Sequence, residues 1–222
     1  MNHTALATGS APSTKERILD AAERLLAKQG FESTSLRAIT TEAEVNLAAV
    51  NYHFQTKEAL FRAVIARRFA PVNERRNAML DGIEAEAGDG ALPVARVIEA
   101  FIRPVLEVRG RSRNIAPIVG RVFAENDEFT ERFFQDHLAA VTRRFLAALT
   151  RATPHLPREE MMWRAHFLVG AMAHNMITGE FFEKVSEGLC RASDIEGLVR
   201  QMVGVFTTVF EAPSTEKVEH EG

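Results

Sequence analysis

A short stretch, residues 47–53, carries side chains suited to contact with nucleic-acid bases. Ala48 and Ala49 are small enough to let a helix lie deep in a major groove, and the amide of Asn51 can both donate to and accept from the edge of an adenine. Asn46, just before the stretch, is a residue type that accepts a backbone N–H at the start of a helix. The chemistry predicted here is recognition of double-stranded DNA.

The elements that must position this stretch form a helix-turn-helix pattern. A first helix over residues 36–43 is predicted to bury one side through residues at helical spacing, namely Leu36, Ile39, Thr40 and Ala43. Thr34 is predicted to cap this helix, and Glu44 lies in the turn that follows it. In the second helix, Leu47 and Val50 are predicted to face inward.

The charge of the chain is divided unevenly. The net charge of the 222 residues is −3, but residues 1–70 carry nine Lys or Arg against seven Asp or Glu (+2), and residues 71–222 carry 18 against 23 (−5). A basic rim is predicted around the second helix, formed by Arg37, Lys57, Arg62, Arg67 and Arg68. Attraction to DNA is therefore expected to be local, and the acidic remainder is expected to repel DNA.

The residues around this pattern resemble the TetR family of transcriptional regulators. The resemblance lies in RILDAAERLLAKQGF at residues 17–31, in YHF at residues 52–54 and in KEAL at residues 57–60. It implies that the Tyr, His and Lys of these motifs hold phosphates, contacts that position a protein on DNA without specifying the sequence. The implied fold is all-α, with about nine helices: an N-terminal three-helix helix-turn-helix DNA-binding domain and a C-terminal helical domain for ligand binding and dimerisation.

The turn departs from the family pattern at one position. The family usually has glycine where this chain has Glu44, and a left-handed backbone at a non-glycine residue costs about 1 kcal/mol, so we expect a tolerated variant. The DNA-binding residues predicted from the pattern and the resemblance are Thr34, Ser35, Arg37, Asn46, Leu47, Ala48, Ala49, Asn51, Tyr52, His53 and Lys57.

Four segments are predicted along the chain: a disordered arm at residues 1–12, the DNA-binding domain at 13–70, the helical domain at 71–211 and a disordered tail at 212–222. Ser13 and Glu16 have the spacing of a capping box at the start of the first helix, and Thr56 can cap the fourth. Pro71 is predicted to kink or interrupt that fourth helix. Glycines from Gly82 onward predict a linker before the next helix.

An interior rich in Phe and Met predicts a pocket for a small apolar ligand, because flexible Met side chains leave adjustable space. Core packing is the simpler explanation for any single residue. A similarity of WRAHFLVGA, residues 163–171, to the PsrA-like subgroup, whose members respond to long-chain fatty acids, implies a fatty acid or acyl-CoA as effector. The predicted ligand-binding residues are Phe101, Val105, Ile118, Phe123, Phe134, Leu138, Phe167, Met172 and Met176.

The last two helices, predicted at residues 158–185 and 194–210, are apolar on more than one side. Small residues on the second side permit close approach of helices from another subunit, and the resemblance implies a four-helix seam of this kind in a homodimer. The predicted dimer-interface residues are His166, Gly170, Ala173, Ile177, Leu198, Met202, Val205, Phe206 and Val209.

Other functions have little support in the sequence. A G-x-S-x-G turn and a Gly-rich phosphate loop are absent, and neither a metal site nor a cofactor is predicted, because His166 and His174 lack converging ligands. One cysteine, no apolar run of about 20 residues and no secretion signal predict a cytoplasmic protein without a membrane partner. The alternative function is a helical protein-protein adaptor that no longer binds DNA.

Overall fold

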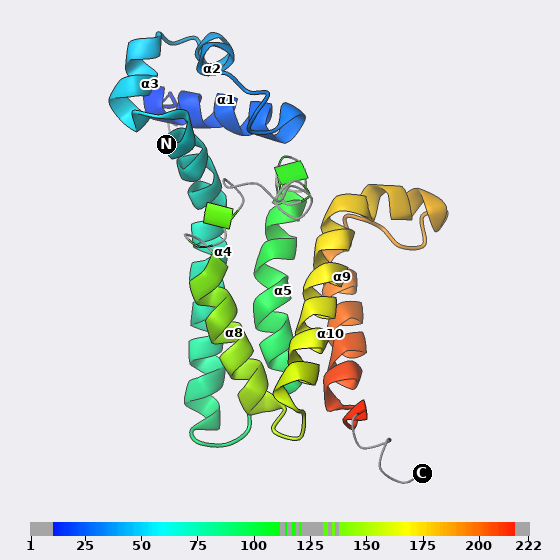
Figure 1. Ribbon diagram of the computed structural model, residues 1–222. Helices are drawn as coiled ribbons and strands as arrows, with labels where there is room; N and C mark the ends of the chain where they lie inside the picture. Colours follow the sequence, from blue (N-terminus) through cyan, green and yellow to red (C-terminus); the bar gives the residue numbers. More distant parts are fainter. Residues whose placement is uncertain are drawn as a thin grey trace, which may run out of the picture. The chain divides into compact units, whose positions relative to one another are not determined.

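The computed structural model describes residues 11–111, 114, 117–118, 120, 131–132, 135 and 138–215, and no β-strand occurs among them. Eight α-helices are defined in these residues (Figure 1), which confirms the predicted all-α fold. The chain divides into two compact units, one up to Ile65 and one from Ala66 onward. The boundary predicted at residue 70 lies inside the helix that contains this division, and it stays a prediction.

In the first unit, α1 (Thr14–Gln29) begins with the predicted capping box. The Glu16 N–H donates to Ser13 Oγ at 3.2 Å, and the Ser13 N–H donates to Glu16 Oε2 at 2.7 Å. The helix ends at Gly30, whose φ of 81° and ψ of 178° belong to a region that is essentially restricted to glycine. The apolar side of α1 is buried through Ile18, Leu19, Ala21, Ala22 and Leu26, and α2 and α3 pack against this helix.

The cap predicted for the next helix, α2 (Leu36–Ala43), is wrong by one residue. Ser35 is the N-cap, and its Oγ accepts from the Ala38 N–H at 3.1 Å. Thr34 is buried instead, and its hydroxyl donates to the Gly30 carbonyl at 2.7 Å. That bond ties the loop to the end of α1 and uses the hydroxyl that a cap would need. The predicted inner side is confirmed for Ile39, Thr40 and Ala43, which are buried.

The helix α4 (Lys57–Ala87) is longer than predicted. It begins after the predicted cap, because Thr56 Oγ1 accepts from the Ala59 N–H at 3.0 Å. It then continues through Pro71 and Gly82, so the predicted interruption and the predicted start of the linker are both wrong. A proline inside a helix removes one backbone hydrogen bond at a cost of about 3 kcal/mol. Burial of Phe69 and Val72 on either side of the proline offsets that cost.

The second unit is a helical bundle. The part of α4 beyond Ile65 lies alongside α5 (Val94–Arg111) and α8 (Ala139–Ala152), and α5 also packs against α9 (Arg158–Val185) and α10 (Ile195–Glu211), as Figure 1 shows. The bounds of α9 and α10 agree with prediction to within one residue at each end. The sequence also predicts a long amphipathic helix that begins at Asp127; α8 is defined from residue 139, and most of residues 127–138 lie outside the described residues.

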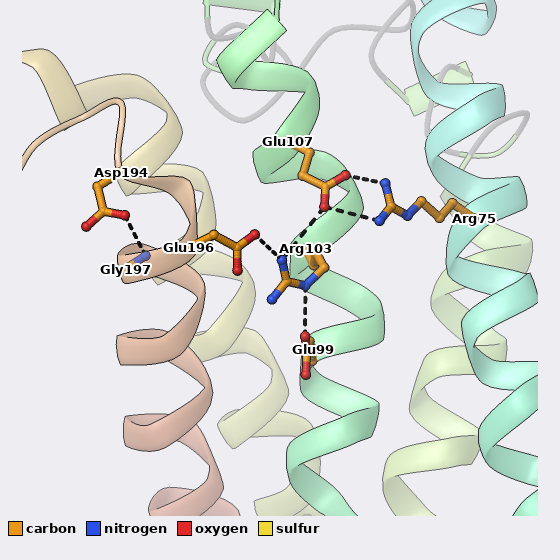
Figure 2. A network of polar contacts seen from close by, with 7 residues as sticks. All are labelled: Arg75, Glu99, Arg103, Glu107, Asp194, Glu196 and Gly197. Carbon is orange, nitrogen blue, oxygen red and sulfur yellow. Dashed lines mark hydrogen bonds and ion pairs between the residues drawn. The ribbon is translucent and has the colours of Figure 1, made fainter.

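A polar network joins three helices of this unit (Figure 2). Arg103 on α5 pairs with Glu99 at 2.8 Å and with Glu196 on α10, and Glu107 pairs with Arg75 on α4. The hydrogen bond that Arg103 donates to Glu196, ahead of the one it donates to Glu99, raises the pKa of Arg103 above its usual value, so this cation stays charged. The network therefore holds α4, α5 and α10 in register at one level of the bundle.

The start of α10 depends on a close approach at Gly197. The Asp194 carboxylate caps the helix by accepting from the Gly197 N–H at 2.8 Å (Figure 2). A Cβ at residue 197 would lie 2.2 Å from Asp194 Oδ2. Only glycine therefore fits beside this cap without displacing it.

The end of α10 is held by a buried arginine of α9. Arg164 donates to the carbonyls of Val209, Ala212 and Pro213 and to the Glu160 carboxylate. Ser214 is buried and donates to the same carboxylate at 2.6 Å. Residues 212–215, predicted to belong to a disordered tail, are therefore anchored, because the orphan carbonyls at the end of a helix need donors.

Replacing Glu44 with glycine is expected to stabilise the protein. Glu44 ends α2 with φ 54° and ψ 48°, a left-handed backbone that costs a non-glycine residue about 1 kcal/mol. In a chain of this size that corresponds to a rise of about 2–4 °C in the thermal midpoint, measurable by circular dichroism. Glu44→Ala is the matched control, because it removes the same carboxylate but keeps Cβ. An equal rise in both variants would assign the effect to charge and contradict the backbone explanation.

The clamp at Glu160 is expected to depend on pH. Hydrogen bonds from Ser214 first and from Arg164 second lower the pKa of Glu160 from 4.5 to about 2. Because the folded-state pKa lies below the unfolded one, the stabilisation is complete above about pH 4.5 and is lost as the pH falls toward 2. Glu160→Gln should therefore lower the thermal midpoint near neutral pH, and its difference from the wild type should narrow below pH 4.5.

Glu159→Gln is the control for this titration, because Glu159 is exposed on the first turn of the same helix. It should leave the midpoint nearly unchanged across the same pH range. A Glu160→Gln deficit that stays constant down to pH 2 would contradict the role of the ionised carboxylate.

Candidate nucleic-acid interface

The outward side of α3 (Leu47–Phe54) presents the residues predicted to read DNA. Ala48 and Asn51 are exposed and Ala49 is half-buried, while Val50 and Phe54 anchor the helix in the core. Leu47, predicted to face inward, is 50% exposed. It lies on the same helical row as Val50, but as the first residue of α3 it remains in solvent beside the outward-facing side chains. The exposed side of α3 is therefore small, with one apolar residue at its start.

The two turns around α3 set its orientation within the first unit. Asn46 is the predicted cap, and its Oδ1 accepts from the Ala49 N–H at 2.8 Å. At the other end, Gln55 has φ 64° and ψ −48°, and the Thr56 N–H donates to the Phe54 carbonyl at 2.7 Å. This is a γ-turn of the rarer, strained form. Sequence reasoning missed it, because glutamine carries no signal for positive φ.

Tyr52, His53 and Lys57 gather at the junction of α3 and α4. The Tyr52 side chain is 83% exposed, and its ring meets the His53 ring edge-on at a centroid distance of 5.0 Å. Lys57 Nζ lies 4.3 Å from the centre of the Phe31 ring and donates to the Glu32 carbonyl at 3.4 Å. These contacts use only part of the hydrogen-bonding capacity of an ammonium with three N–H donors. The lysine is thus positioned while donors remain for another anion.

Glu58 occupies the first turn of α4 next to this lysine. The pKa of Glu58 is below its usual value, first because its own backbone N–H donates to the carboxylate. An anionic side chain that already uses the free N–H groups at a helix start competes with a phosphate there. Phosphate contact at this junction is therefore expected through the side chains of Tyr52 and Lys57 and not through the start of α4.

The predicted residues at the start of α2 differ in accessibility. Ser35 and Arg37 are exposed. Thr34 is fully buried and bonded to the Gly30 carbonyl, so its prediction as a DNA contact is corrected: its side chain does not reach the surface.

The predicted ligand-binding residues are mostly in the core of the second unit. Those that are buried are Phe101, Val105, Ile118, Met172 and Met176. Leu138 is half-buried, and Phe123 and Phe134 lie outside the described residues. Phe167 is 57% exposed, so its prediction as an interior residue is wrong: it projects from the outer side of α9, about four turns before Phe181, which is also exposed.

One surface groove of about 520 Å³ is present between α8 and the start of α9. Its lining residues are Arg143, Leu146, Ala147, Thr150, Thr153, Leu156, Arg158, Met161 and Met162. None of them belongs to the predicted ligand set.

The predicted dimer-interface residues separate into two groups. His166, Gly170, Ile177 and Val205 are exposed, and Leu198 and Val209 are half-buried. Ala173, Met202 and Phe206 are buried within the chain, so their assignment to a subunit surface is corrected. Small or flexible apolar residues on α9 and α10 fill the interior of their own unit, where these helices contact each other.

The described residues contain neither a membrane-spanning helix nor a metal-ion site. No helix in the described part of the chain is long and apolar enough to span a bilayer. Within the same residues, no group of three His, Cys, Asp or Glu side chains is arranged to hold a metal ion.

The chain matches two family descriptions that agree with this geometry. Residues 18–64 match "Bacterial regulatory proteins, tetR family", and residues 99–208 match "Tetracyclin repressor-like, C-terminal domain". The nicotine-responsive transcriptional repressor HdnoR of Paenarthrobacter nicotinovorans is 36% identical over 70 residues, which are 32% of this chain and 36% of that protein. The alignment thus spans about a third of this curated relative.

Solved structures extend the likeness to the whole fold. A putative tetR-family regulator from Shewanella sp. PV-4 has a TM-score of 0.62 at 15% identity, covering 90% of this chain and 96% of that one. The fatty acid degradation regulator FadR from Bacillus halodurans has a TM-score of 0.56 at 13% identity, covering 90% and 97%. Both of these proteins are named as regulators. The first family match contains the exposed helix α3 and the second lies within the second unit, and together they establish that this chain belongs to the TetR family of transcriptional regulators.

Proposed function

We propose that the protein is a dimeric transcriptional repressor that binds a palindromic DNA operator through α3 and is released by a small apolar ligand. The observation that carries the proposal is the exposed outer side of α3, which combines small residues, Asn51 and Tyr52 while Val50 and Phe54 anchor the helix. An adaptor without DNA binding would not need a helix of this kind. An electrophoretic mobility shift with operator DNA separates the two functions.

The residues of the interface divide into two roles. Asn51 is the candidate for direct readout, because an amide can bond both groups of an adenine edge, and Ala48 and Ala49 permit close approach in the major groove. Tyr52, His53 and Lys57, together with Ser35 and Arg37 at the start of α2, hold phosphates on either side. Because the proposed partner is operator DNA, the proposed location of the protein is the cytoplasm.

The dimer interface is the exposed apolar face of α9 and α10. Trp163, Phe167, Ile177 and Phe181 project from α9, and Val205 projects from α10. Trp163 stacks on Phe167 at a centroid distance of 6.1 Å, and nothing lies within 4 Å of a Cβ placed at Gly170. Large apolar residues beside an open glycine position suit close packing with the same face of a second copy.

The effector acts through α4, the helix that belongs to both units. A ligand that binds one helix arrangement better than another shifts the equilibrium between them, and a coupling of about 1–3 kcal/mol gives 5- to 150-fold release. Two reader helices must lie about 34–36 Å apart to enter successive major grooves, so a small displacement of α4 weakens operator binding. A fatty acid or acyl-CoA is the proposed effector, and one fold neighbour is named as a fatty acid degradation regulator.

Replacing Lys57 with alanine is expected to weaken binding to every DNA sequence and to lower the slope of log K against log salt by about 0.9, the contribution of one phosphate contact. Asn51→Ala should instead change the preference among operator variants with little change in slope. Both are measured by fluorescence anisotropy at several salt concentrations. Arg24→Ala provides the control, because the exposed Arg24 is already paired with Glu42 at 2.9 Å. An unchanged slope for Lys57→Ala would contradict the phosphate contact.

Placing a charge on the proposed dimer face should produce monomers. Phe167→Glu leaves the core of the protomer intact because Phe167 is exposed, and it places carboxylates in the centre of an apolar interface. Leu189→Glu is the matched control, because Leu189 is an exposed apolar residue beyond the end of α9. Sedimentation velocity should give a monomer for the first variant and a dimer for the second. A stable dimer of Phe167→Glu would show that the interface lies elsewhere.

A further inference from the structure

A buried arginine in the second unit has no anionic partner among the residues that the structure describes. Arg76 lies on α4 and is 3% exposed. Its Nε donates to the Phe101 carbonyl on α5 at 2.8 Å, and its Nη1 donates to Asn73 Oδ1 at 3.3 Å. A guanidinium has five N–H donors, so two of the five are used and three remain, including both on Nη2.

The pairing of the neighbouring arginines makes Arg76 unusual. Five other arginines of this unit each pair with a carboxylate: Arg75 with Glu107, Arg96 with Glu86, Arg103 with Glu99, Arg144 with Glu84 and Arg164 with Glu160. In the described part of the chain no Asp or Glu pairs with Arg76. Burial alone lowers the pKa of Arg76 to about 9, which leaves it a cation at neutral pH. A buried charge without a partner opposes folding.

The guanidinium is also held in a fixed position. It lies 4.2 Å from the centre of the Phe101 ring, and the Phe145 ring of α8 stacks on the same ring at 4.0 Å and 17°. Two groups this close to one ring centre must lie on its opposite faces, so α4, α5 and α8 each contribute one layer. The remaining N–H donors are therefore oriented before any ligand arrives, which reduces the entropy lost on binding.

A purely structural role for Arg76 would not require a charged side chain with unused N–H donors. Joining α4 to α5 through the Phe101 carbonyl needs one neutral donor, as a glutamine would provide. A permanent cation with free donors, lying on the face of the Phe101 ring, instead matches an anion with an apolar body. Arginine binds a carboxylate through two parallel hydrogen bonds, which gives both strength and orientation.

We propose that Arg76 binds the carboxylate of the effector, and that the effector is an apolar monocarboxylic acid and not a neutral molecule. This inference rests on the proposed response to a small ligand and specifies its head group. The acid joins the layered contact of α4, α5 and α8 and supplies the negative charge that the described residues do not. Because α4 carries Arg76, occupation of this site acts directly on the helix shared by both units.

The test compares matched acids and alcohols on the full-length protein by titration calorimetry and thermal shift. Octanoate, dodecanoate and hexadecanoate are used beside octanol, dodecanol and hexadecanol. At least one acid should bind and raise the thermal midpoint, and the alcohol of equal length should bind at least about thirtyfold more weakly. Arg76→Gln keeps a donor for the Phe101 carbonyl and should lose at least about thirtyfold in affinity for that acid. Equal binding of acid and alcohol, or no binding by any acid, would overturn the proposal.

Two more variants separate binding from structure. Arg75→Gln alters the adjacent arginine, which is already paired with Glu107, and should leave acid binding within about twofold. Arg76→Lys retains the charge without the planar fork and should bind the acid more tightly than Arg76→Gln. If Arg76→Gln does not fold, the effect of Arg76 on acid binding can still be measured with Arg76→Lys. Acid binding that survives unchanged in a folded Arg76→Gln would assign Arg76 to structure alone.

Operator binding is measured in the same samples. If the ligand-free protein does not bind operator DNA, the regulatory function fails, yet selective binding of acids through Arg76 would still support this inference. If the operator is bound and acids neither bind nor release it, the inference on Arg76 fails while the DNA-binding function remains.

Discussion

The structure depends on the continuity of α4. Its N-terminal turns are buried in the first unit through Leu60, Phe61, Val64 and Ile65, and its C-terminal turns are bonded to the helices of the second unit. Pro71 lies between these two regions and removes a backbone hydrogen bond without ending the helix. The helix survives because both of its ends are fixed by tertiary contacts, so the energy of packing exceeds the local cost of the proline.

The helices of the second unit are joined by two kinds of interaction. Apolar side chains form the interior, and arginines at its edge bridge neighbouring helices, as the network of Arg75, Arg103 and Glu196 in Figure 2 illustrates. Partly exposed ion pairs of this sort contribute little individually, about 0–1 kcal/mol each, but they choose between helix registers that an apolar interior alone would tolerate. Arg76 differs from them because it lies inside and has no carboxylate partner among the described residues.

Exposure distinguishes the surfaces with a proposed role from the rest of the chain. Tyr52 and Leu47 on α3 and the aromatic face of α9 are apolar groups left in solvent. Isolated groups of this kind are normal, but a row along one helix indicates a surface that is covered by a partner. The first set faces a candidate DNA partner, and the second faces a candidate second subunit. In both cases the same helix is anchored on its opposite side, through Val50 in α3 and Leu168 in α9.

The amino-acid sequence by itself determined the helical fold, the capping box at Ser13, the caps at Asn46 and Thr56, and the location of helix α3, because these depend on side chains within a few residues of one another. Tertiary structure alone decided which side of α9 and α10 is buried, because both sides are apolar and the spacing of apolar residues does not distinguish the buried side from the exposed one. It also decided that α4 continues through Pro71, where distant packing outweighs a local preference. The isolation of Arg76 has the same origin: a sequence shows where a charge is, but only the folded chain shows which charges surround it.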